Sequence, residues 1–541
     1  MTDNLYRLQR QPVLCHFFFP CSGLGVWSFY FLLKVALVTQ GTLTLNLFWN
    51  LALFTFLVIP AGPRWVRISR QVISVSAATV LLYSESNLPP FERLIDQWHL
   101  VSSFSSLYLF ELVLRIVPVE WIAAFLISCI LYMYLAKFLR MTRVTLVALL
   151  SVPFWSGVSI SNAPLLTPAT GQQPTALQGQ GLIQREPSQI LEQFYREQRE
   201  VVLTPTPDLA PDFDIIILNI CSLSWSDLKA FDLLDHPFMS RADILLTNFY
   251  SGSSYSGPAA LRLLQASCGQ RPHSELFAPI ESCTLGSQLA EQGFSHEIRM
   301  NHTGAFDNFL TDIRQLGGLA NAPFITPKKF AVAMEGFDQS PIYSDSAVLN
   351  DWLKTTTNTP LFTFYNTTSL HDGNQVSGFI GNSRGSYKQR LKNLLDDFNN
   401  LFDDIEASGR AVLVIMVPEH GAGLDGDRFQ LPGMREIPTP ALTHVPVMIK
   451  LFGPSQATAR NEQPTTVQVT HNTGPLAITD AIYKIIAQQP FSGGQYQPEQ
   501  VAKSLPKSRP VAENEGVIMM EVNGEFYLQI NRGNWRPYKD N

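Results

Sequence analysis

The sequence has no long run of charge of one sign and no internal repeat. Its 39 basic and 45 acidic residues give a net charge of −6 over 541 residues, without clustering. Proteins that bind nucleic acids usually carry a concentrated basic patch, so we expect no nucleic-acid partner. A chain of this length exceeds one ordinary core, and its composition changes along its length. We therefore expect several domains of different kinds.

Cysteine is scarce, with six residues in the whole chain. Three lie in the amino-terminal third: Cys15, Cys21 and Cys129. In an oxidising compartment Cys268 and Cys283 could close a loop of about 15 residues, which would be worth about 3 kcal/mol. Cys221 then has no partner, and binding a metal is one way to keep such a thiol reduced.

The region from Trp27 to about residue 160 has few charges and is dominated by Leu, Val, Phe, Ile and Ala. A bilayer span needs about 20 apolar residues, and some of the segments here are short for that length. No small-residue cleavage site stands out after the first segment, so we expect it to remain as a span. We predict five transmembrane helices, at 28–43, 45–60, 72–86, 119–137 and 144–160.

Basic residues predict the orientation of these spans. They form three clusters: Arg7 and Arg10; Arg64, Arg67 and Arg70; Lys137, Arg140 and Arg143. By the positive-inside rule each cluster is cytoplasmic. The amino terminus is then cytoplasmic, and everything after about residue 160 lies outside the cytoplasm.

The segment 103–117 is apolar except for Glu111 and Arg115, which lie one helical turn apart. It is either a sixth span or an amphipathic helix on the outer membrane surface. We favour the surface helix, because burying a charge pair is costly and an even number of spans would break the charge pattern.

A stretch rich in Pro, Gln, Thr and Gly, 161–187, predicts a flexible tether. A short amphipathic helix is expected after it, from the spacing of Ile190, Leu191, Phe194 and Tyr195. We thus divide the chain into a membrane domain (1–160), a tether with a short helix (161–210) and an outer domain (211–541).

The outer domain alternates apolar runs with helical patterns, which favours a sandwich with a central, mostly parallel sheet flanked by helices. The clearest helical pattern, 387–405, is followed by Gly409 as a stop signal. Strands are predicted at 214–220, 244–249, 330–333, 361–365, 412–418 and 445–451.

Polar side chains follow several of these strands directly. Cys221 follows the first strand, His371 and Asp372 lie in the loop after 361–366, and Glu419 and His420 end the apolar run from Val412. In α/β sheets ligands and metals gather at the carboxyl ends of strands. We expect these side chains to meet there, although each alone could be an ordinary loop residue.

Ser256 precedes an apolar helical pattern with Pro258 near its start, so we predict Ser256 as the N-cap. That role alone would explain the serine. A serine at a helix start is also well placed to attack phosphorus, since helix amino-terminal N–H groups bind phosphate oxygens. Arg435 follows in a Gly- and Pro-rich loop and is suited to gripping phosphate, although a solvated loop arginine is the simpler interpretation. His302, in the run NHTG, is less specific.

The runs NICSLSWSD, SSYSGPAALRLL, YNTTSLHDGN and PEHGAGLDGDR together resemble the alkaline phosphatase superfamily, and within it the membrane-anchored phosphoethanolamine transferases. They are most similar to the bacterial cellulose phosphoethanolamine transferases, the G subunits of cellulose synthesis systems. The lipid A and lipoteichoic acid branches usually have an acidic residue at the position of Cys221, threonine at Ser256 and Asp-His at Glu419-His420. The cellulose branch has Cys, Ser and Glu-His, as this chain does.

This resemblance implies an inner-membrane enzyme with a periplasmic catalytic domain and one zinc ion, held by Cys221, Glu419 and His420 with Ser256 as the fourth ligand. Few spare carboxylates are present for a second metal. Ser256 would take phosphoethanolamine from phosphatidylethanolamine and pass it to glucose 6-hydroxyls of cellulose, beside other cellulose synthase subunits.

The other implied roles are those of His371 as general acid or base, Arg435 as a ligand of phosphate or acceptor, and Tyr255 in the pocket lining. Lipid A, another glycan or water remain alternative acceptors. A non-catalytic subunit of a polysaccharide synthase is the alternative from another class.

Overall fold

The computed structural model describes residues 24–40, 43–60, 63–86, 104–116, 119–155, 181–206, 209–355, 357, 359–427, 429–454 and 466–539. The chain divides into two compact units. The first comprises Met1–Asp96 and Ile116–Thr175, and the second comprises Gln97–Arg115 and Ala176–Asn541.

The first unit is helical in its described part. Its helices are α2 (Trp27–Thr39), α3 (Leu47–Val58), α4 (Arg64–Glu85), α8 (Val119–Leu135) and α9 (Met141–Trp155). Each predicted span overlaps a helix, but among the described residues no single helix has both the length and the apolar character of a membrane span. One pair, Ser106–Arg115 with Glu120–Leu135, reaches that length and composition together. The five spans remain a prediction.

An eight-stranded sheet forms the centre of the second unit, in the order β11-β2-β10-β9-β1-β7-β3-β4. Only β10 runs antiparallel to its neighbours in this sheet, so the prediction of a mostly parallel sheet is confirmed. The strands are β1 (Asp214–Ile220), β2 (Ile244–Tyr250), β3 (Ser295–Met300), β4 (Phe324–Ile325), β7 (Leu361–Thr367), β9 (Val412–Pro418), β10 (His444–Phe452) and β11 (Val467–Val469).

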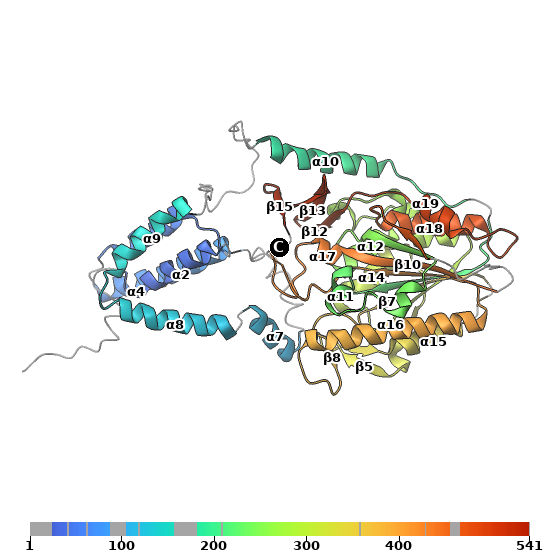
Figure 1. The fold of residues 1–541 in the computed structure, drawn as a ribbon, viewed down its shortest axis with the longest axis horizontal. Helices are drawn as coiled ribbons and strands as arrows, with labels where there is room; N and C mark the ends of the chain where they lie inside the picture. The colour runs from blue at the N-terminus through green and yellow to red at the C-terminus, as the bar shows by residue number, and fades with distance from the viewer. Residues whose placement is uncertain are drawn as a thin grey trace, which may run out of the picture. The chain divides into compact units, whose positions relative to one another are not determined.

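Helices cover both faces of this sheet (Figure 1). Side chains of β1 alternate between the two cores: Ile215 and Ile217 pack toward α12 (Ser256–Leu264) and α18 (Pro475–Gln488). Ile216 packs on the other side, against α16 (Ser383–Ser408). Further helices of this unit are α11 (Trp225–Ala230), α13 (Leu285–Glu291), α14 (Phe309–Leu316), α15 (Asp345–Leu353), α17 (Pro440–Thr443) and α19 (Pro498–Lys503).

Helix α16 contains the predicted pattern 387–405 and extends it in both directions. Gly409 ends the helix as expected, with a left-handed φ of 67° that favours glycine. At the other end the side chain of Asn382 accepts a hydrogen bond from the Gly385 amide, so Asn382 is the N-cap.

Two smaller sheets lie outside the central one. The first, β6-β5-β8, consists of β6 (Pro341–Tyr343), β5 (Val332–Glu335) and β8 (Gln375–Val376). The second is antiparallel and consists of β12 (Val511–Asn514), β13 (Val517–Val522), β14 (Glu525–Ile530) and β15 (Arg536–Tyr538). The predicted strand at 330–333 is therefore misplaced: its residues contribute to the largely exposed β5 and not to the buried sheet.

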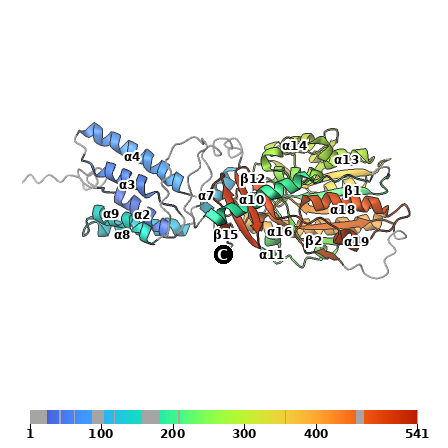
Figure 2. The ribbon, with the colours of Figure 1, turned by 90° about the horizontal axis from the view of Figure 1, so that it is seen from above.

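Helix α10 (Gly181–Arg199) packs on the antiparallel sheet through Phe194, which contacts the core around Val511 and Met520 (Figure 2). The predicted amphipathic helix is present, but it is longer than expected. The predicted tether at 161–187 ends too late, because residues 181–187 already belong to α10. Its part at 161–180 lies outside the described residues.

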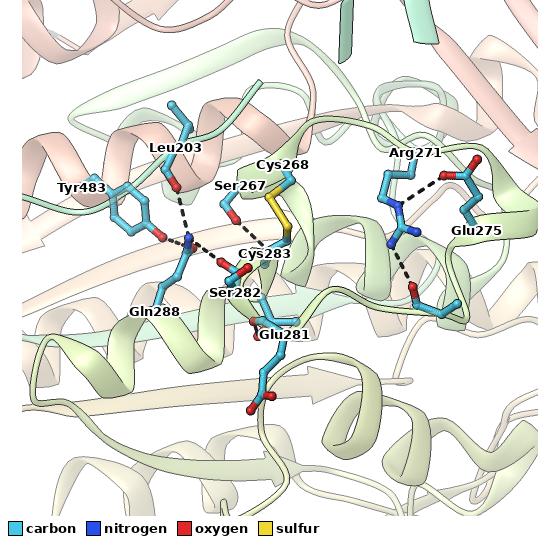
Figure 3. The surroundings of a disulfide bond; sticks show 12 residues. Leu203, Ser267, Cys268, Arg271, Glu275, Glu281, Ser282, Cys283, Gln288 and Tyr483 are labelled. Atoms are coloured by element: carbon cyan, nitrogen blue, oxygen red, sulfur yellow. Dashed lines mark hydrogen bonds and ion pairs between the residues drawn. A yellow bond between two sulfur atoms is a disulfide. The ribbon is translucent and has the colours of Figure 1, made fainter. Parts of the chain in front are cut away.

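The predicted disulfide between Cys268 and Cys283 is present, and it joins the chain after α12 to the segment before α13 (Figure 3). A hydrogen bond holds the same two segments together, because Ser267 Oγ donates to the Cys283 carbonyl (2.8 Å). Beside it, Gln288 Nε2 of α13 donates to the Ser282 carbonyl (3.0 Å). The disulfide thus fixes the carboxyl-terminal end of α12 and not its amino-terminal end.

Candidate active site

Three neighbouring strands end at one edge of the central sheet. In the register of the sheet, Ile220 of β1 lies beside Thr367 of β7 and Pro418 of β9. Cys221 and Glu419, which come next in the chain, are therefore placed side by side. The ligand atoms of Cys221, Glu419 and His420 lie within 4.8 Å of one another, and all three residues are buried.

Ser256 completes this cluster from the start of α12. Its Oγ lies 3.4 Å from Cys221 Sγ and 3.2 Å from His420 Nε2. The prediction that Ser256 is the N-cap is wrong, because Tyr255 occupies that position and Ser256 is the first helical residue. The Ala259 amide donates to the Tyr255 carbonyl (3.0 Å), which starts the helix one residue earlier and leaves the serine hydroxyl directed at the cluster.

The donor atoms of this cluster fit a zinc ion. His420 Nδ1 donates to the Gly421 carbonyl (2.8 Å), which leaves the lone pair of Nε2 facing Cys221 and Ser256. Glu419 Oε1 accepts a hydrogen bond from Asn366 Nδ2 (2.7 Å), whereas its buried Oε2 accepts none from the described residues. A thiolate, an imidazole and a carboxylate with a free oxygen are ligands that tetrahedral zinc prefers.

Burial dominates the electrostatics of the cluster. It raises the pKa of Glu419 to about 7. Burial and the nearby Glu419 charge raise the pKa of Cys221 to about 11, while burial and the Arg435 charge lower the pKa of His420. The Arg435 charge opposes the upward pKa shifts of Glu419 and Cys221 but does not cancel them, and a divalent metal would reverse the direction of both shifts.

A second layer of hydrogen bonds orients Glu419. Asn366, at the end of β7, donates to Glu419 Oε1 and also to Asn219 Oδ1 (2.9 Å). In turn His302 Nε2 donates to Asn366 Oδ1 (2.7 Å), and His302 Nδ1 accepts from the Gly304 amide (3.1 Å). Sequence reasoning gave His302 little weight and missed Asn366. The position of Asn366 at the end of a buried apolar run was the available signal.

His371 and Arg435 meet beside the cluster. Arg435 Nη2 donates to His371 Nε2 (2.9 Å), and Arg435 Nη1 lies 3.4 Å from His420 Nε2. His371 Nδ1 donates to the Asp372 carbonyl (2.6 Å), so its Nε2 is an acceptor. Burial and the Arg435 charge lower the pKa of His371 to about 3, so this imidazole is neutral.

Tyr255 lies against the Arg435 loop, because its hydroxyl donates to Glu436 Oε1 (2.8 Å). The loop before Ser256 and the Arg435 loop are also joined by Ser254 Oγ, which donates to the Arg435 carbonyl (2.6 Å). Asn514 of β12 donates to that same carbonyl (3.0 Å) and accepts from the Ser254 amide (3.3 Å). No pattern in the sequence indicated Asn514, which lies far along the chain in a separate sheet.

Two family models match this chain. The model described as the cellulose biosynthesis protein BcsG C-terminal domain matches residues 173–535, and that of the BcsG N-terminal domain matches residues 27–154. The cellulose biosynthesis protein BcsG of Escherichia coli (strain K12) is 34% identical over 549 residues, covering 95% of this chain and 96% of that protein. The corresponding protein of Salmonella typhimurium (strain LT2) is 33% identical with the same coverage.

Among solved structures, a protein in the alkaline phosphatase superfamily from Vibrio parahaemolyticus is similar at 14% identity and a TM-score of 0.45, covering 65% of this chain and 91% of that one. The two family models, together with relatives that align along almost their whole length, decide the family. The chain belongs to the family of the cellulose biosynthesis protein BcsG.

Proposed function

We propose that this protein transfers phosphoethanolamine from phosphatidylethanolamine to glucose 6-hydroxyls of cellulose. The observation that carries the proposal is the placement of Ser256 Oγ, at the first helical residue of α12, 3.2 Å from His420 Nε2 and 3.4 Å from Cys221 Sγ. A serine in this position is a nucleophile beside a metal site. Membership of a cellulose biosynthesis family supports the choice of acceptor.

One zinc ion would be held by Cys221, Glu419 and His420, with the oxygen of Ser256 in the fourth position. When bound, zinc would lower the pKa of the serine hydroxyl and neutralise phosphate charge. The buried, unpaired Oε2 of Glu419 supports this site, because burying a carboxylate oxygen without a partner is costly.

Ser256 acts as the nucleophile in two steps. Its Oγ forms a bond to phosphorus while the bond from phosphorus to the glycerol oxygen breaks, and diacylglycerol leaves with a proton. A glucose hydroxyl then attacks the same phosphorus and releases Ser256. The free N–H groups in the first turn of α12 stabilise the phosphate oxygens during both steps.

His371 and Arg435 serve the transferred group and the acceptor. Arg435 reaches both histidines of the site, so its planar fork can hold a phosphate oxygen between them. When Arg435 turns from His371 to the phosphate, Nε2 of the neutral imidazole is free to take the proton of the attacking glucose hydroxyl. Tyr255, linked to Glu436 beside Arg435, lines the same side of the pocket.

A lipid donor requires the catalytic unit to work at a membrane surface. We propose that the apolar helices of the first unit anchor the chain in the bacterial inner membrane and that the second unit lies in the periplasm, with other cellulose synthase subunits as partners. Helix α7 (Ser106–Ile116) presents an exposed apolar side formed by Leu107, Phe110, Val113 and Leu114, as expected of a surface helix.

Mass spectrometry of the full chain tests the nucleophile, the donor and the covalent intermediate together. After incubation with phosphatidylethanolamine micelles, we expect a phosphoethanolamine adduct on Ser256 and release of diacylglycerol. Ser256→Ala should abolish both, whereas Ser282→Ala, an exposed serine near the disulfide, should change neither. Diacylglycerol release that persists in Ser256→Ala would overturn the proposal.

The acceptor needs a separate experiment in cells. Phosphorus on isolated cellulose and on lipid A is measured with and without the gene. We expect loss of the phosphorus label from cellulose, and a loss confined to lipid A would overturn the cellulose assignment. A chain that binds no zinc and whose Ser256→Ala variant leaves cell products unchanged would be a structural subunit.

A further inference from the structure

Helix α7 precedes α8 and α9 in the sequence. It contacts the loop that carries His371. Arg115 binds Asp372 through two hydrogen bonds, from Nη1 to Oδ2 (2.6 Å) and from Nη2 to Oδ1 (3.1 Å). The hydroxyl of Tyr108, which precedes Arg115 in the same helix, also donates to Asp372 Oδ2 (3.1 Å). Asp372 is buried, with 1% of its side chain exposed, so this is a desolvated bidentate ion pair.

Asp372 is also hydrogen-bonded to the ring of His371. The carbonyl of Asp372 accepts the hydrogen bond from His371 Nδ1 that sets the tautomer of the ring. The same side of α7 also reaches the start of α16 (Figure 1): Glu111 accepts from the Ser383 amide (3.2 Å), and Ser383 Oγ donates to Asp372 Oδ1 (2.6 Å). Glu111 also pairs with Arg115, so the helix holds the loop at several points.

The same segment supports the ring of His371 from its face. Phe337 stacks on His371 with ring centroids 4.1 Å apart and an angle of 20° between the rings. The amide of Ser105 donates to the Phe337 carbonyl (2.9 Å), and the ring of Tyr108 packs against Phe337 at 6.2 Å. Phe337 is thus held between the imidazole and the beginning of α7.

The Arg435 loop also passes against this ion pair. A side chain added at Gly433 would place its Cβ 2.6 Å from Arg115 Nη1 and 3.0 Å from Asp372 Oδ2. Only glycine allows this approach, and its φ of +83° favours glycine as well. Two residues later Arg435 donates to His371. The His371 loop and the Arg435 loop therefore both lie against Arg115 of α7.

We propose that α7 is a positioning element of the active site and that Arg115, through Asp372 and the Gly433 turn, sets the mutual placement of His371 and Arg435. The inference rests on the proposed function of this site. Catalysis would then depend on a helix whose sequence lies between α4 and α8, two helices of the first unit. A shift of about 1 Å in such groups is enough to slow a reaction about 100-fold.

The test compares full-length variants in phosphatidylethanolamine micelles by the rate of adduct formation on Ser256. We expect Arg115→Ala to lower the maximal rate at least about tenfold. The half-saturating lipid concentration and the zinc content per chain should stay unchanged. Arg115→Lys should restore part of the rate, since one ammonium can pair with Asp372 but cannot reproduce the bidentate contact. A merely destabilising change would not produce this split.

Arg241→Ala is the matched control, because Arg241 also pairs with two carboxylates, those of Asp403 and Glu406, on a distant surface. Its rate should stay within about twofold of the parent, in line with the small energies of exposed pairs. An Arg115→Ala rate as high as that of Arg241→Ala would overturn the inference.

Hydrogen exchange provides a readout that does not depend on the proposed reaction. In Arg115→Ala, amides at 368–374 and 433–435 should exchange faster than in the parent, while those of β1 and β9 should not change. Unchanged exchange in both loops would overturn the positioning role. A parent chain that forms no adduct at all would instead contradict the proposed function, and the exchange result would still decide the role of Arg115.

Discussion

The Glu419 carboxylate has two oxygens in different environments. Oε1 is fixed by Asn366, which is itself fixed by Asn219 and His302. Oε2 accepts no hydrogen bond from the described residues and faces the region where Cys221 and His420 converge. Metal-binding carboxylates are typically held in this way, with one oxygen oriented by a neighbour so that the other can bind the ion.

Replacing the thiol is the most direct test of the zinc ligands. Cys221→Ser exchanges a soft sulfur for a weakly acidic hydroxyl, so zinc content per purified chain should fall from about one to near zero. Elemental analysis of the purified protein measures this content. Cys129→Ser, at the other described cysteine outside the disulfide, serves as the control and should retain zinc. Full zinc occupancy in Cys221→Ser would exclude the thiol as a ligand.

The hydrogen bond from Asn366 predicts a smaller effect of the same kind. Asn366→Ala removes the donor that orients Glu419 while leaving all ligands in place, so zinc affinity should fall about 10- to 100-fold. Competition with a chromophoric chelator measures that affinity. Asn248→Ala, on β2, removes a side-chain hydrogen bond to the Thr470 carbonyl and should leave the affinity unchanged. Equal affinities for the two variants would show that Glu419 is held without Asn366.

At the scale of elements, the strands that could be predicted are those with unbroken apolar runs. β1 and β9 are buried along their length, and their sequences show it. β3 could not be predicted, because Glu297 and Arg299 interrupt its apolar pattern. Both side chains are nevertheless buried, and Arg299 Nε donates to Glu297 Oε1 (2.8 Å). Apolar periodicity alone can therefore miss a strand of the main sheet that contains a buried pair of opposite charges.

The disulfide is expected to stabilise the segment between α12 and α13. A double replacement, Cys268→Ser with Cys283→Ser, should lower the free energy of unfolding by about 3 kcal/mol, since the bond closes a loop with a sequence separation of 15. Urea unfolding of the full chain, with the fluorescence of the second unit as the signal, measures this change in the free energy of unfolding. Zinc content should stay the same, because the bond lies at the far end of α12 from Ser256. A loss of zinc would contradict that separation.

At the scale of the whole molecule, α7 shows the limit of prediction from sequence. The spacing of Glu111 and Arg115 predicted an amphipathic helix, and the helix is present. Its polar side is not solvated, however, because it binds Asp372, 257 positions further along the chain. Neither apolar periodicity nor charge spacing indicates which distant carboxylate an arginine will bind. The site residues Cys221 and Glu419 could be predicted because each directly follows a strand that can be recognised.

The arrangement predicts that the second unit is catalytically incomplete when α7 is missing. A chain that begins at Ala176 retains Cys221, Ser256, Glu419 and His420, so it should bind one zinc ion per chain. Without Tyr108, Glu111 and Arg115, Asp372 loses its charge partner and keeps the hydrogen bond from Ser383, and the His371 loop loses its support from α7. We expect this chain to form the Ser256 adduct at least about tenfold more slowly than the full-length protein, measured with the same phosphatidylethanolamine micelles. Asp372→Asn should lower the full-length rate but slow the shortened chain much less, because the partner of Asp372 is already absent there. Equal rates for the two lengths would show that α7 contributes nothing to the reaction.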